Sequence, residues 1–176
     1  HLIHDYAIAR SLIPSLAPRF VAFAISEPLA PVFYRQSFVM ALDELWDGPD
    51  GVTGFWRACL ELESSPQLHS FTRILAPLLA ARRIESSKDL LPLIETISLS
   101  PPEDHPSIKA ARHLSSGLED ASPQTIRLGA SAWCEYACQL GALLASFPAL
   151  ESALVYLVAR LLDVNAVIVD EDRRWI

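Results

Sequence analysis

Proline placement is the feature that most constrains how this chain can fold. The chain contains thirteen prolines and only six glycines. Several prolines open an apolar run with helical spacing, at Ser65-Pro66, His105-Pro106, Ser122-Pro123 and Phe147-Pro148. Proline suits the first turn of a helix because the backbone nitrogen there has no intrahelical partner. A serine just before it can cap the next free amides. The pattern predicts a series of short helices with few flexible joints.

Apolar residues recur at intervals of three and four through most of the chain, which favours helices over strands. We expect roughly nine helices, including one over 123–146 and one over 148–163. Two further helices are expected to begin at Ser65-Pro66 and at Pro31, and Pro77 is expected to kink or break the first of them. The strand-like piece is Ala166–Val169, which is short and β-branched. We therefore predict an all-α domain over 1–163, followed by an extended or strand-like segment over 164–176 that could hold one short terminal strand.

Paired helices recur about 40 residues apart along the chain, but no residue-level repeat accompanies this rhythm. The expected architecture resembles an irregular helical array of the HEAT or armadillo kind. An orthogonal multi-helix bundle is the alternative. The resemblance is one of architecture and implies no functional residue.

Composition excludes several function classes. The formal net charge is −7, and Lys88 and Lys109 are the only lysines, which argues against nucleic acid as the main partner. The longest apolar stretches carry charges or prolines, so no transmembrane helix is expected. Three cysteines form no disulfide framework and indicate an intracellular protein. Hydrophobic residues make up 51% of the chain, an excess that indicates a large core or an apolar surface covered by another molecule.

No motif in the sequence predicts catalysis, a metal site or a cofactor. Cys134 and Cys138 lie one helical turn apart, but two ligands do not complete a zinc site. We expect both to be small apolar fillers beside Trp133. The histidines, among them His69, His105 and His113, are expected at the surface or at helix caps.

The densest acidic cluster consists of Asp43, Glu44, Asp47 and Asp50. We interpret it as a solvated helix end. Carboxylates near a helix C-terminus oppose the helix dipole, which indicates a cationic neighbour or partner.

The leading functional hypothesis is a non-enzymatic interaction or scaffold domain that binds another protein. Its candidate contacts are Arg173, Arg174 and Trp175, because Trp and Arg are enriched at binding hot spots. The alternative hypothesis is a helical small-molecule-binding domain, either a ligand-gated regulator or an enzyme, with an apolar pocket. That pocket would be lined by Phe33, Phe38, Phe55 and Trp56.

Overall fold

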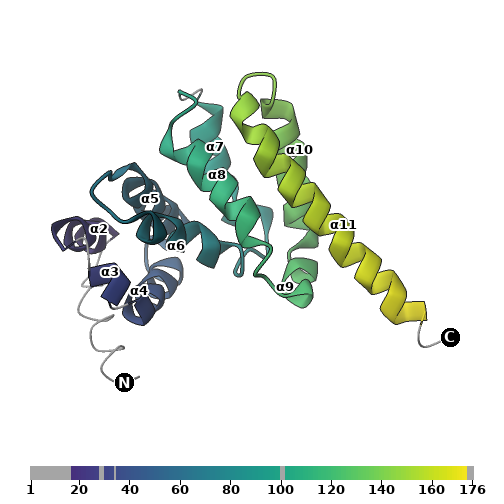
Figure 1. The fold of residues 1–176 in the computed structure, drawn as a ribbon, viewed down its shortest axis with the longest axis horizontal. Helices are drawn as coiled ribbons and strands as arrows, with labels where there is room; N and C mark the ends of the chain where they lie inside the picture. The colour runs from purple at the N-terminus through teal and green to yellow at the C-terminus, as the bar shows by residue number, and fades with distance from the viewer. Residues whose placement is uncertain (1–16, 28–29, 34, 100–101, 174–176) are drawn as a thin grey trace.

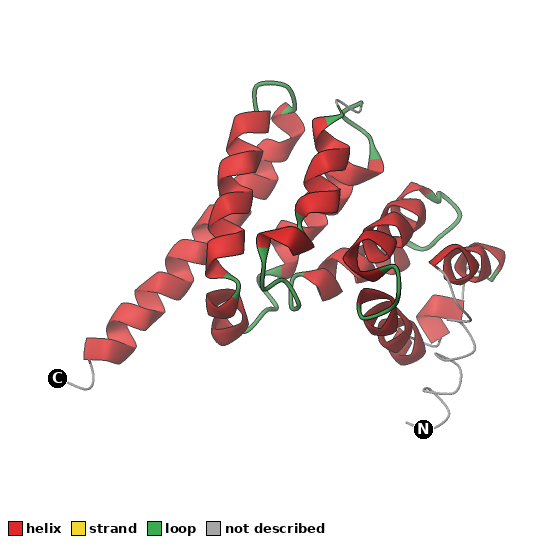
Figure 2. Cartoon of the chain, turned by 180° about the vertical axis from the view of Figure 1, so that it is seen from behind, coloured by secondary structure: helices red, strands yellow, loops and turns green. Residues whose placement is uncertain are grey.

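The computed structural model describes residues 17–27, 30–33, 35–99 and 102–173, with only the backbone described for 17–20, 30–31 and 165–173. Every regular element in these ranges is a helix, as Figure 2 shows, so the predicted all-α fold is confirmed there. The α-helices are α2 (Ala17–Ser26), α3 (Ala30–Phe33), α4 (Arg35–Trp46), α5 (Gly51–Ser64), α6 (Ser70–Ala80), α7 (Leu91–Ser98), α8 (Pro106–Gly117), α9 (Pro123–Leu128), α10 (Ala130–Leu143) and α11 (Glu151–Arg173). Two 3-10 helices accompany them, η1 (Ser87–Asp89) and η2 (Pro148–Leu150).

Two of the proline-marked helix starts have the predicted geometry. Before α9, the Ser122 hydroxyl accepts a hydrogen bond from the backbone nitrogen of Thr125 at 3.1 Å. Before α8, Nδ1 of His105 accepts one from the backbone nitrogen of Ser107 at 3.2 Å. In both helices the next residue is a proline in the first turn, where its missing N–H costs nothing.

The helix start predicted at Ser65-Pro66 is wrong. Ser65 follows the last residue of α5, and its hydroxyl donates back to the carbonyl of Glu61 at 2.9 Å. The next helix begins at Ser70, where His69 caps the amide of Phe71. That helix runs through Pro77 to Ala80, so the proline does not break it.

Gly129 divides the single helix predicted over 123–146 into α9 and α10. A Cβ atom on Gly129 would overlap the backbone carbonyl oxygen of Ile84 and lie 3.1 Å from Nε1 of Trp133. The chain bends where two backbone segments approach this closely, and only glycine leaves room for that approach. The break depends on Ile84, some 45 residues earlier in the sequence.

The extended or strand-like segment predicted over 164–176 is also wrong over 164–173, the part of it that the structure describes. The backbone of α11 continues helically to Arg173 and includes Ala166–Val169. No glycine or proline lies between Asp163 and Ala166 to stop the helix. Adding residues to an existing helix is far easier than starting a strand that has no neighbour to pair with.

Helix α8 lies at the centre of the fold. It packs against α5, α6, α7 and α11, while α10 and α11 lie side by side at one end (Figure 1). The last turns of α11 extend beyond the other helices toward the C-terminus. The largest fully buried side chains come from both halves of the chain: Trp56, Trp133, Tyr136, Phe38, Phe55, Leu42, Leu62, Ile84, Leu90, Leu93 and Ile97. Among the described residues, no helix combines the length and apolarity needed to cross a membrane.

Candidate functional site

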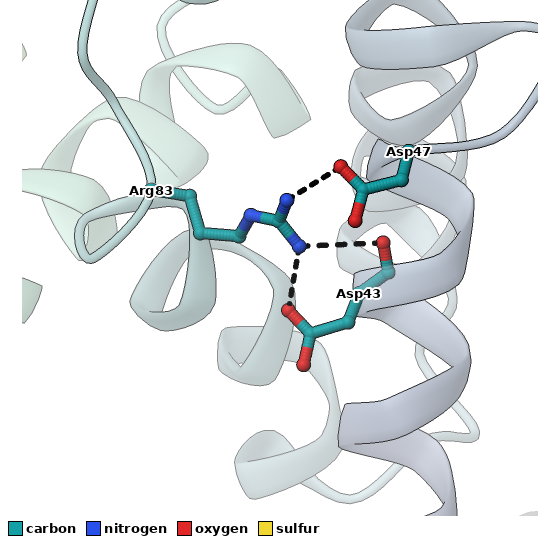
Figure 3. A network of polar contacts seen from close by, with 3 residues as sticks. All are labelled: Asp43, Asp47 and Arg83. Atoms are coloured by element: carbon teal, nitrogen blue, oxygen red, sulfur yellow. Dashed lines mark hydrogen bonds and ion pairs between the residues drawn. The ribbon is translucent and has the colours of Figure 1, made fainter.

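The acidic cluster binds a cation from within the chain, as the sequence indicated. Figure 3 shows Arg83, just after α6, reaching Asp43 on α4 and Asp47, which directly follows the end of α4. Its Nη1 lies 3.0 Å from Oδ1 of Asp43, and its Nη2 lies 2.6 Å from Oδ1 of Asp47. The guanidinium also lies 5.5 Å from the centre of the Trp46 ring. Partial burial alone would lower the pKa of Arg83, but the hydrogen bonds and charges of Asp47 and Asp43 raise it overall. The cluster is a link between α4 and α6.

Cys134 and Cys138 are exposed, so the interpretation of both as apolar fillers is wrong. The buried face of α10 is formed by Trp133, Tyr136 and Leu140, and the helical period turns the two cysteines away from it. Cys59 is fully buried and free. Burial, and secondly the nearby charge of Glu63, raise the pKa of the Cys59 thiol well above its usual value. In the described part of the chain, no three His, Cys, Asp or Glu side chains are placed to hold a metal ion.

Three of the four aromatic residues assigned to an apolar pocket, Phe38, Phe55 and Trp56, belong to the packed interior. Phe55 contacts Trp46 and Trp56 edge to face, with ring centroids 4.9 and 5.6 Å apart. Phe38 is buried as well, whereas Phe33 is 76% exposed and lies at the surface. Close-packed rings of this kind leave no room between them for a ligand.

Helix α11 carries apolar side chains on two faces. Its inner face packs against the fold through Leu157 and Val164, which are both buried. The outer face of α11, defined here as Val155, Val158, Ala159 and Leu162, is exposed. Val155 and Leu162 are 61% and 63% exposed, and both lie on the same side of the helix as Val158. The sequence predicted a helix over 148–163 but did not show which of its apolar residues would be exposed.

A pocket of about 460 Å³, called the polar pocket here because of its charged lining, opens between α5, α6, α8 and α11. Its charged lining residues are Glu63, Arg73, Lys109, Arg112 and His113. His105 and His69 are helix caps, as expected, but His113 instead lies 3.4 Å from the buried carboxylate of Glu63. The sequence did not reveal this pocket because its residues come from four helices, with no local motif.

The C-terminal segment Arg173–Trp175, predicted to contact a partner, begins at the last residue that the structure describes. Arg173 is the last residue of α11, and Arg174 and Trp175 fall outside the described residues. Comparison with known proteins finds no matching family model, no similar curated protein and no similar solved structure.

Proposed function

We propose that this chain is a protein-interaction domain that binds a partner protein through the outer face of α11, without catalysing a reaction. The observation that carries the proposal is the pair of apolar faces on this one helix. Arg160 and Asp163 are the only charged residues between Ser152 and Val164. A helix that is apolar nearly all round is normally covered on all sides.

Arg160 does not interrupt the outer face, because it is used within the fold. Its Nε donates to the carbonyl of Leu118 at 3.0 Å, and Nη2 donates to the carbonyl of Ala121 at 3.2 Å. These bonds fix α11 against the segment that follows α8, and they leave Val155, Val158 and Leu162 exposed. The proposed interface is therefore held on a rigid support.

The partner that best fits this face is an amphipathic helix of another protein. Val155, Val158, Ala159 and Leu162 are spaced by three and four residues, the spacing at which two helices pack side by side. The C-terminal residues Arg173, Arg174 and Trp175 remain proposed additional contacts, because α11 runs toward them in the same direction.

Two broader assignments accompany the proposal. The HEAT- or armadillo-like arrangement is supported by successive helix pairs, with α7–α8 lying beside α10–α11 (Figure 1). The intracellular location is supported by the two exposed free thiols of Cys134 and Cys138, because such thiols persist in a reducing compartment.

The test is affinity purification of the tagged chain from cells that express it, followed by mass spectrometry. The variant Val155→Glu/Leu162→Glu places charges on the outer face of α11. The control is Leu99→Glu/Leu128→Glu, which changes two leucines that are 83% and 68% exposed elsewhere. We expect the α11 variant to lose the partner and the control to keep it, with both retaining the wild-type helical circular dichroism spectrum.

Retention of the same partners by the α11 variant would contradict the proposal. Removal of residues after Asp163 then tests the distal segment separately. Loss of the partner in the truncated chain, with thermal stability intact, would assign binding to the C-terminal residues, whereas full retention would exclude them.

A further inference from the structure

The polar pocket has a charge opposite to that of the chain as a whole. Arg73, Lys109 and Arg112 line it together with a single carboxylate, Glu63. Three positive charges against one negative charge leave the pocket with two positive charges when His113 is neutral. The whole chain has 14 basic and 21 acidic residues, for a formal net charge of −7. Such a local reversal of charge attracts anions.

The three cations are not neutralised by other side chains in the described part of the chain. The ion pairs found there join Arg83 to Asp43 and Asp47, and His113 to Glu63. Arg73 belongs to none of them, and its Nε is buried without a hydrogen-bond partner. A buried donor of this kind normally has an acceptor. The acceptor in this pocket is therefore expected from a bound molecule.

Glu63 supplies the opposite chemistry in the same pocket. The side chain of Glu63 is 3% exposed, and its Oε2 lies 3.4 Å from Nδ1 of His113. Neither of these two atoms has a hydrogen-bond partner. A carboxylate withdrawn from water this far needs donors around it. Glu63 is therefore placed to accept a hydrogen bond from a ligand's hydroxyl or amino group.

Hydroxyl groups complete the lining. Ser70 comes from α6, Ser116 from α8, and Ser152 and Tyr156 from α11. The volume of about 460 Å³ is large enough for an organic ligand with a body as well as a charged head. Guanidinium groups bind phosphate oxygens in pairs, and lysine acts as a further point charge.

We propose that this pocket binds a small phosphomonoester that also carries a hydroxyl or amino group. The phosphate lies against Arg73, Lys109 and Arg112, and the hydroxyl or amino group donates to Glu63. The net charge of the pocket matches the dianion of a phosphomonoester near neutral pH. This inference is independent of the proposed protein interface, since the pocket is lined by residues of α5, α6, α8 and α11 and by none of the residues of the outer face.

The test is isothermal titration calorimetry on the full chain with phosphoserine, glucose 6-phosphate and inorganic phosphate, and with serine as the unphosphorylated comparison. The key variant is Lys109→Glu/Arg112→Glu. The control is Lys88→Glu/Arg82→Glu, which makes the same residue changes at exposed positions outside the pocket. Circular dichroism of both variants verifies the fold.

We expect saturable binding of the two organic phosphates, with serine at least about tenfold weaker than phosphoserine. The pocket variant should weaken phosphoserine binding by about tenfold or more, while the control stays within about twofold of wild type. Glu63→Gln should reduce the preference for phosphoserine over inorganic phosphate, because Glu63 accepts from the body of the ligand and its negative charge does not favour the phosphate itself.

Three results would overturn the proposal. One is no saturable binding of either organic phosphate. Another is equal weakening in the pocket variant and the control, which would show that only the overall charge matters. The third is tighter binding of an acetylated and amidated phosphoserine peptide than of both small phosphates, which would assign the pocket to a phosphorylated protein segment.

Discussion

The indole Nε1 of Trp56 on α5 donates a hydrogen bond to the backbone carbonyl of Asp89, 2.7 Å away in η1. Trp56 is fully buried, so this bond satisfies the one polar atom of a large core side chain. We expect Trp56→Phe to lower the free energy of unfolding by about 1–3 kcal/mol, because it leaves a buried carbonyl without a partner and removes packed atoms. Urea unfolding followed by circular dichroism measures the change. An unchanged midpoint would show that water replaces the indole.

Tyr136 provides the opposite case. Its hydroxyl is buried in α10 and has no hydrogen-bond partner, and burial raises the pKa of its phenol well above the usual value. Tyr136→Phe removes this unpaired polar group while retaining the ring. We expect the melting temperature to stay the same or rise slightly. A loss of more than about 1 kcal/mol would indicate that the hydroxyl has a bound partner such as water.

Gly129 and Gly141 form a matched pair on either end of α10. A methyl group at Gly129 would overlap the Ile84 carbonyl, whereas at Gly141 it would only contact Leu154 at 3.9 Å. We expect Gly129→Ala to destabilise the chain by about 2 kcal/mol or more through overpacking. Gly141→Ala should stabilise it by about 0.5–1 kcal/mol, because alanine favours a helix interior. Equal thermal shifts in the two variants would contradict the close approach at Gly129.

The link between Arg83 and Asp47 is expected to contribute modestly, because Asp47 is largely exposed. We predict a coupling energy of about 0.5–1 kcal/mol in a double-mutant cycle of Arg83→Gln and Asp47→Asn. The coupling should shrink in 1 M salt, where charges at the surface are screened. A coupling that is insensitive to salt would mean that the contact depends on hydrogen-bond geometry more than on charge.

The three thiols should differ in reactivity. Cys134 and Cys138 are exposed, whereas Cys59 is buried and its pKa is raised. Thiolate is the reactive form, so a thiol reagent at pH 8 should label two cysteines in the folded chain and the third only after unfolding. Raising the pH within the folded range should still leave Cys59 unlabelled, because its thiol is buried and its pKa is raised. Labelling of Cys59 as fast as the others would contradict its burial.

Local chemistry determined the helical class and several helix starts. Apolar spacing near 3.6 residues and proline in a first turn act within a few neighbouring residues, which is why the starts of α8 and α9 were predictable. The cation beside Asp43 and Asp47 was predictable in kind, because the helix dipole opposes carboxylates at that end. The identity of that cation was not predictable, because Arg83 lies in the turn after α6, far from Asp43 and Asp47 in the sequence.

Only the tertiary structure decided the features that depend on distant segments. The break at Gly129 exists because the backbone of Ile84 passes beside it. The pocket exists because Glu63, Arg73, Lys109 and Tyr156 are brought together from four helices. The outer face of α11 is exposed because packing on α8 and α10 covers one side of an apolar helix and leaves the other uncovered. Periodicity shows that such a helix has apolar faces, but which of them is buried depends on the helices that pack against it.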